Sequence, residues 1–95
     1  MFKKYRLTAQ EIKLLKQLLK LKDLNEPDGY DKEKVVGLVN SNHEMSKEEI
    51  RHIRNYVIQK NIEYGFEDDE PNELGYETEE LFDKLLDILE ERTDK

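Results

Sequence analysis

The chain has two histidines and no cysteine. The histidines are its first candidates for acid–base or metal chemistry near neutral pH. His43 lies in a polar connector and His52 follows Arg51 in an expected helix; neither stands at a diagnostic spacing from a nucleophile. The sequence also has no glycine-rich phosphate loop, nucleophile elbow or HExxH motif. A catalytic site needs a polar group with a shifted pKa and a partner that orients it, both in a pocket. We therefore expect no catalytic residue, no cofactor and no enzymatic activity.

Metal binding is a second chemistry that the acidic turns suggest. Residues 23–29 resemble part of a calcium loop, which in an EF-hand places oxygen ligands at its first, third and fifth positions and a glutamate at its twelfth. If Gly29 takes the glycine position, Leu24 falls at the first position and Val35 at the twelfth. Neither side chain can bind calcium, and two histidines are too few for a convincing zinc site. We therefore expect no metal site.

Carboxylates in the last third of the chain are the strongest chemical signal. Residues 61–95 carry a net charge of −11, whereas residues 1–22 carry +6 and the whole chain carries −7. An acidic field attracts basic partners and raises their association rate. We therefore predict that the acids of an expected loop at residues 65–76 contact a basic protein surface. These acids are Asp68, Asp69, Glu70 and Glu73.

Apolar anchors for such contacts are expected beside the same loop. Ile58 and Ile62 fall outside the apolar stripe of the preceding helix, and Phe66 follows that helix closely. Buried apolar side chains supply most of the affinity of an interface, whereas charges steer the encounter. The sequence therefore predicts a non-catalytic protein-interaction module, acting as a small acidic regulator or inhibitor. Two tyrosines, Tyr30 and Tyr76, are expected to pack between helices instead.

Nucleic-acid binding is the alternative. Residues 32–60 resemble a divergent helix-turn-helix in outline, whose second helix would present Lys47, Arg51 and Arg54 to the DNA major groove. Two features oppose this interpretation: the turn is long and lacks the usual glycine, and the chain is acidic, whereas DNA affinity needs a basic face. A nucleic-acid-associated regulator is therefore our second hypothesis, and an oligomeric structural module is the third.

The candidate side chains lie on or next to expected helices, so the helix N-termini help to position them. Two stretches of the sequence show the same N-terminal pattern. Residues 7–16, LTAQEIKLLK, and residues 45–54, MSKEEIRHIR, each place a hydroxyl residue three positions before a glutamate. This spacing predicts a capping box, and the apolar residue before each hydroxyl predicts a hydrophobic staple. The pairs are Thr8 with Glu11 and Ser46 with Glu49.

The match between the two stretches continues past the capping residues. Residues 7–22 align with residues 45–60, and residues 25–39 resemble residues 69–86, with Glu-Pro and then Gly-Tyr before an acidic helix start. We therefore predict an internal duplication with a pseudo-twofold axis. Repeat 1 would cover about residues 7–44, and repeat 2 about residues 45–95. Convergent patterning of helix hairpins is the alternative explanation.

Apolar residues recur with the helical period in four segments, and no alternation typical of strands is evident. The segments are residues 8–23, 31–41, 46–64 and 78–92. We predict an all-α fold in which the four helices form two tandem helix–loop–helix hairpins. These would pack as a compact bundle, a single domain over residues 1–95.

The remaining composition limits the setting in which the protein works. No apolar run approaches the roughly 20 residues of a membrane span, and no signal-peptide core follows the basic N-terminus. We expect a cytoplasmic protein that does not bind membranes and is a monomer or a homodimer. Its high content of lysine, glutamate and asparagine is compatible with a bacterial or phage genome.

Overall fold

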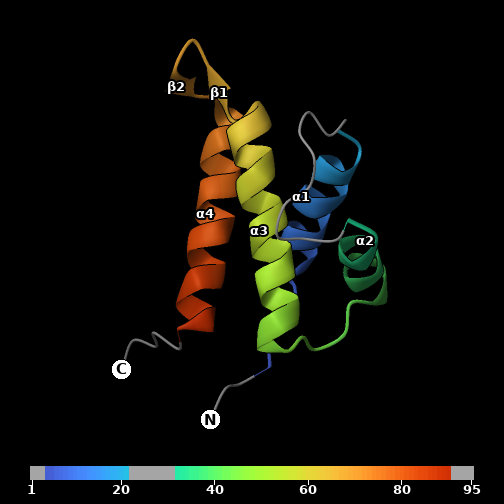
Figure 1. Ribbon diagram of the computed structural model, residues 1–95. Coiled ribbons are helices and arrows are strands. Elements are labelled where there is room, and N and C mark those ends of the chain that lie inside the picture. The colour runs from blue at the N-terminus through green and yellow to red at the C-terminus, as the bar shows by residue number, and fades with distance from the viewer. Residues whose placement is uncertain (1–3, 22–31, 91–95) are drawn as a thin grey trace.

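The computed structural model describes residues 4–21 and 32–90 of the chain. The four predicted helices are present (Figure 1). A short β-hairpin that the sequence did not reveal connects the third helix to the fourth. The elements are α1 Ala9–Leu19, α2 Lys32–Ser41, α3 Lys47–Tyr64, β1 Phe66–Glu67, β2 Glu70–Pro71 and α4 Glu73–Leu89. The all-α class and the helical bundle are therefore confirmed.

Both predicted capping boxes form. Thr8 accepts a hydrogen bond from the Glu11 N–H at 3.2 Å, and the Glu11 carboxylate accepts one from the Thr8 N–H at 2.9 Å. Ser46 and Glu49 make the same two bonds at 3.3 and 2.9 Å. Each pair satisfies two backbone groups that have no partner inside the helix. Local sequence therefore fixes the starts of α1 and α3.

The two helix starts also share a contact that the sequence comparison missed. The Tyr5 hydroxyl donates to Glu11 at 2.7 Å, and the Nε2 of His43 lies 3.2 Å from Glu49. Tyr5 and His43 stand 38 positions apart, the same offset that relates the two capping boxes. Both therefore contact a glutamate six positions later in the chain.

The segments before α1 and α3 also lie side by side. Tyr5 and Met45 form an isolated antiparallel bridge, with bonds of 2.8 and 3.4 Å between their backbones. A twofold axis that exchanges residues 38 positions apart would place His43 where Tyr5 is and Leu7 where Met45 is. It would therefore relate the Tyr5–Met45 bridge to a pairing of Leu7 with His43, which has the same antiparallel register. The internal duplication nevertheless remains a prediction.

Helix α3 is the centre of the bundle. It lies between α4 on one side and α1 with α2 on the other (Figure 1), and its largest interface is with α4. Hydrophobic burial of the facing side chains supplies the main stabilising free energy. The buried core consists of Leu7, Leu15, Leu18, Val35, Leu38, Val39, Met45, Ile50, Ile53, Tyr56, Val57, Leu81 and Leu85.

The predicted boundaries of α2 and α3 agree with the structure to within one residue, but the predicted start of α4 was wrong. This helix begins at Glu73 rather than at residue 78, because the side chain of Asn72 accepts a hydrogen bond from the Gly75 N–H at 2.8 Å and caps it. The prediction had treated Gly75 and Tyr76 as residues before the helix, whereas both lie inside it.

Residues 65–76 are correspondingly not a plain loop, since they contain strands β1 and β2 and the first turn of α4. Two-residue strands are too short to show alternation in a sequence. The first predicted helix, residues 8–23, was too long, because α1 ends at Leu19 with Lys20 as its C-cap. Residues 22–23 lie outside the described residues, as do Tyr30 and residues 23–29, which were compared with a calcium loop.

Candidate functional site

A two-residue turn forms the end of the hairpin between α3 and α4. Phe66 pairs with Pro71 and Glu67 with Glu70, which leaves Asp68 and Asp69 as the turn residues. Their φ angles are 52° and 67°. Two central residues with positive φ define a type I′ turn, the turn whose twist matches that of a β-hairpin. Two of the predicted acids, Asp68 and Asp69, therefore stand on a defined turn, whereas Glu70 lies in β2 and Glu73 begins α4.

The base of the hairpin is held by backbone approach and by one asparagine. The Asn72 N–H donates to the Gly65 carbonyl at 2.9 Å, and its side-chain amide donates to the Tyr64 carbonyl at 2.8 Å. A Cβ on Gly75 would lie only 2.2 Å from the Gly65 carbonyl oxygen. Gly65 and Gly75 therefore allow α3 and α4 to cross closely where the hairpin begins.

A buried polar contact fixes the two helices just below this crossing. The side-chain amide of Asn61 donates to the Thr78 hydroxyl at 2.8 Å and to the Gly75 carbonyl at 3.2 Å. The Thr78 hydroxyl in turn donates to the Leu74 carbonyl at 2.8 Å. Buried polar groups that are satisfied in this way specify one packing arrangement. The hairpin therefore projects from a rigid support.

Exposed side chains of both kinds gather at this end of the molecule. Ile62 is 61% exposed, Phe66 50% and Tyr76 61%. The predicted acids are all exposed as well, whereas Ile58 is only partly exposed. Tyr76 does not pack between helices as expected, because α4 begins early and turns it outward. We define the hairpin tip as Ile62, Phe66, Glu67, Asp68, Asp69, Glu70, Glu73 and Tyr76.

The acids of the hairpin tip are not the most stable choice for this hairpin. Asp68 suits the first central position of a type I′ turn, but Asp69 holds the second position at positive φ, where glycine is favoured and a residue with a Cβ costs up to about 1 kcal/mol. Glu67 lies opposite Glu70, and like charges in directly opposed positions are destabilising. None of the four forms an ion pair within the described part of the chain. Asn-Gly or Asp-Gly would therefore give this turn a more stable sequence than two aspartates.

A second polar cluster joins the start of α1 to α4. The Nζ of Lys84 donates to the Glu11 carboxylate at 2.6 Å and lies 5.4 Å from the centre of the Tyr5 ring. Burial alone would raise the pKa of the Glu11 carboxyl, but hydrogen bonds from Lys84, Thr8 and Tyr5 together lower this pKa. The same contact with Glu11 raises the pKa of Lys84.

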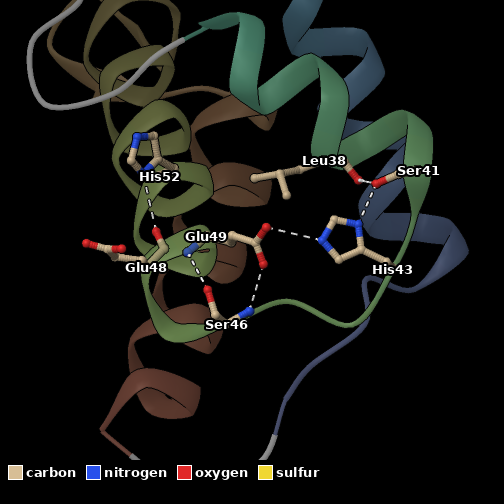
Figure 2. Close-up of polar contacts among 7 residues, drawn as sticks. All are labelled: Leu38, Ser41, His43, Ser46, Glu48, Glu49 and His52. Atoms are coloured by element: carbon tan, nitrogen blue, oxygen red, sulfur yellow. Dashed lines mark hydrogen bonds and ion pairs between the residues drawn. The ribbon is translucent and has the colours of Figure 1, made fainter.

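The connector between α2 and α3 brings one histidine into a polar chain (Figure 2). His43 lies with its Nδ1 2.6 Å from the Ser41 hydroxyl and its Nε2 3.2 Å from Glu49. The sequence spacing did not reveal this arrangement. Glu49 also accepts the Ser46 N–H, and that bond, with help from His43, lowers the pKa of the Glu49 carboxyl. This row of polar contacts is largely exposed and joins the end of α2 to the first turn of α3.

The other histidine makes a local contact. The Nδ1 of His52 lies 3.2 Å from the backbone carbonyl of Glu48, one turn earlier in α3 (Figure 2). Within residues 4–21 and 32–90, no group of three histidine, aspartate or glutamate side chains is arranged to hold a metal ion.

Sequence reasoning also missed a buried ion pair in α3. The Nζ of Lys60 lies 3.2 Å from Glu63, and both side chains are fully covered. The same ammonium group lies 5.7 Å from the Tyr56 ring centre and 5.6 Å from that of Tyr64. The spacing of two tyrosines four positions on either side of a lysine was the available signal, because residues four apart share a helix face.

The three cations of the helix-turn-helix hypothesis are not alike in the structure. Arg51 is exposed and Lys47 is partly exposed. Arg54 instead donates from its Nε to the Phe82 carbonyl at 3.0 Å, with its guanidinium 5.9 Å from the centre of the Phe82 ring. Arg54 therefore contributes to the packing of α3 against α4.

Comparison of the chain with protein-family models, with curated proteins and with solved structures found no significant match. Among the described residues, no helix is long and apolar enough to cross a membrane.

Proposed function

We propose that this chain is a non-catalytic interaction module that uses the hairpin tip to bind a basic surface of another protein, which it regulates or inhibits. The observation that carries this proposal is the turn at Asp68 and Asp69. Asn-Gly would suit a type I′ turn better than two aspartates. Asp69, at the position where glycine is preferred, adds a second charge to the turn that its backbone conformation does not call for, which supports a role in binding.

Apolar side chains beside the acids support the same proposal. Ile62, Phe66 and Tyr76 are large and exposed, and they flank the acidic turn. Aromatic residues are enriched among those that dominate binding free energy, and surrounding charges raise the association rate. The hairpin tip thus combines candidate anchors with a steering charge.

The rigid base of the hairpin favours binding for an entropic reason. The bonds of Asn72 and the close crossing of Gly65 and Gly75 fix the turn in the free protein. A surface that is already ordered loses less conformational entropy when a partner binds. The hairpin tip therefore suits a partner with a fixed basic surface.

Affinity capture from a cell lysate, with and without nuclease, tests this proposal. The bait is the full chain, with Phe66→Ala and Arg51→Gln as variants. We expect a stoichiometric basic protein that survives nuclease treatment, is lost with Phe66→Ala and is retained with Arg51→Gln. Loss of every partner on nuclease treatment, with dependence on Arg51, would reject the proposal in favour of nucleic-acid association. Circular dichroism of each variant checks that it is folded.

A further inference from the structure

A groove of about 860 Å³ runs between α1 and α4, from Glu77 next to the hairpin tip to Lys84. It arises because α4 packs mainly on α3 and scarcely touches α1. Side chains of both helices line it: Thr8, Ala9, Gln10, Glu11, Lys13, Leu14, Gln17, Glu77, Glu80, Leu81 and Lys84. We call this feature the α1–α4 groove.

The two walls of the α1–α4 groove carry opposite charges. Lys13 stands on the α1 wall, and Glu77 and Glu80 stand on the α4 wall. All three side chains are exposed, and none of them forms an ion pair with another described residue. Among the residues that line the groove, Glu11 and Lys84, toward one end, form an ion pair across it. Most of the groove therefore presents unpaired charges of both signs.

The apolar part of the groove lies between these walls. Leu14 is partly exposed on α1, and Leu81 lies almost fully buried on α4. An occupant that matches the groove covers the exposed part of Leu14 while it offers an acid to Lys13 and a base to the two glutamates. A surface of one sign would match one wall and be repelled by the other.

We propose that a second copy of this chain occupies the α1–α4 groove, forming a twofold-symmetric homodimer. If two grooves face each other about an axis parallel to their length, α1 of each copy lies over α4 of the other. Lys13 of each copy then meets Glu77 and Glu80 of its counterpart, so that both walls are satisfied at once. The groove is complementary to itself under this rotation, and that complementarity identifies the occupant.

This symmetry has a consequence for the hairpin tip. The groove runs along α4 from Glu77 to Lys84, and the hairpin lies just before α4 (Figure 1). A twofold axis parallel to the groove leaves both hairpins at the same end of the dimer. Two tips that point the same way allow bivalent binding, which raises the apparent affinity without any new contact.

Sedimentation equilibrium over a concentration series, with two charge reversals, tests the dimer. Lys13→Glu places like charges opposite each other at both symmetry-related contacts, and so does Glu80→Lys. We expect each variant alone to raise the dimer dissociation constant by at least about tenfold. An equimolar mixture should restore association to within about threefold of the unchanged chain. In the mixed dimer, the glutamate introduced by Lys13→Glu faces the lysine introduced by Glu80→Lys, so that opposite charges meet again.

Two controls separate the groove from general charge effects. Glu79→Lys makes the same charge change on α4 outside the groove, and we expect it to leave association nearly unchanged. The tip variant Asp68→Asn with Asp69→Gly should dimerise like the unchanged chain, so that the dimer and the function of the tip are tested separately. A monomer at every concentration up to about 1 mM, or a folded mixture that fails to restore association, would overturn the proposal.

Discussion

At the scale of single residues, Glu11 joins three parts of the structure. It caps α1, accepts the Tyr5 hydroxyl and binds Lys84 from α4. We expect Glu11→Gln to lower the free energy of unfolding by about 1–2 kcal/mol, since a bond to a charged group is lost and Lys84 is half exposed. Urea unfolding at pH 7 measures this value. The matched variant Glu49→Gln alters the same kind of capping contact, with Ser46, but otherwise only an exposed contact with His43, and should cost less than about 1 kcal/mol.

The lowered pKa of the Glu11 carboxyl predicts the pH dependence of the same difference. A carboxyl whose pKa is lower in the folded state contributes stability above its unfolded value, near 4.5, and loses it as the pH falls through the folded value. The difference in unfolding free energy between the unchanged chain and Glu11→Gln should therefore shrink below about pH 4. A difference that stays constant down to pH 2 would contradict this account of the Glu11 cluster.

Glycine gives a second prediction at this scale, because two glycines face opposite demands. A Cβ at Gly75 would lie 2.2 Å from the backbone oxygen of Gly65, whereas a Cβ at Gly37 would meet nothing within 4 Å. We expect Gly75→Ala to destabilise the fold by about 2–3 kcal/mol through overpacking. Gly37→Ala, within α2, should stabilise it by about 0.5–1 kcal/mol. Thermal unfolding of the two variants checks both signs, and equal effects would show that the close helix crossing is not needed.

At the scale of elements, the hairpin between α3 and α4 has a turn whose sequence is not the one that its type I′ conformation favours. Asp68→Asn with Asp69→Gly supplies the residues that a type I′ turn favours and removes two like charges. We expect this pair to raise the free energy of unfolding by about 1–2 kcal/mol, which corresponds to a rise in Tm of several degrees for a domain of this size.

The control for this prediction is Asp68→Asn with Asp69→Asn, which removes both charges but retains a Cβ at each position of positive φ. Its stabilisation should be smaller than that of the Asn-Gly variant. If both variants are as stable as the unchanged chain, the turn is not strained, and the argument from strain to function fails.

The starts of α1 and α3 could be predicted from the sequence, whereas the start of α4 could not, and the difference has a physical reason. Thr8 and Ser46 act through contacts three residues away, which a sequence shows directly. The Asn72 cap of α4 also acts three residues away, on the Gly75 N–H, but Gly75 stands where a capping box has glutamate, so the local signal was weaker. The hairpin before α4 further holds Asn72 through its bonds to Tyr64 and Gly65, and a sequence does not show such contacts.

The candidate site was predictable to a similar degree. The acids at residues 68–70 and the apolar residues Ile62 and Phe66 were identified from charge and from position outside the helical stripe. Tyr76 and the positive φ angles of the turn were not, because both depend on where α4 begins and on how β1 and β2 pair. Arg54 likewise required the structure, since its contact lies 28 residues away at Phe82.

At the scale of the whole molecule, positive and negative charges are separated along the chain. The first 22 residues carry +6 and the last 35 carry −11. The hairpin tip presents the acids of the turn, while the α1–α4 groove presents both signs. The two surfaces meet on α4, where Tyr76 of the hairpin tip directly precedes Glu77 of the groove, and the rest of the groove continues along α4 to Lys84.

The measurement that tests the central claim most directly compares two variants that each remove two negative charges. One is Asp68→Asn with Asp69→Gly in the hairpin tip, and the other is Glu79→Gln with Asp83→Asn on the exposed side of α4. Titration calorimetry with the captured partner gives both dissociation constants. We expect the tip variant to weaken binding by at least about tenfold and the α4 variant by less than about twofold. Equal weakening by the two variants would contradict the account, because net charge rather than the hairpin tip would then direct binding.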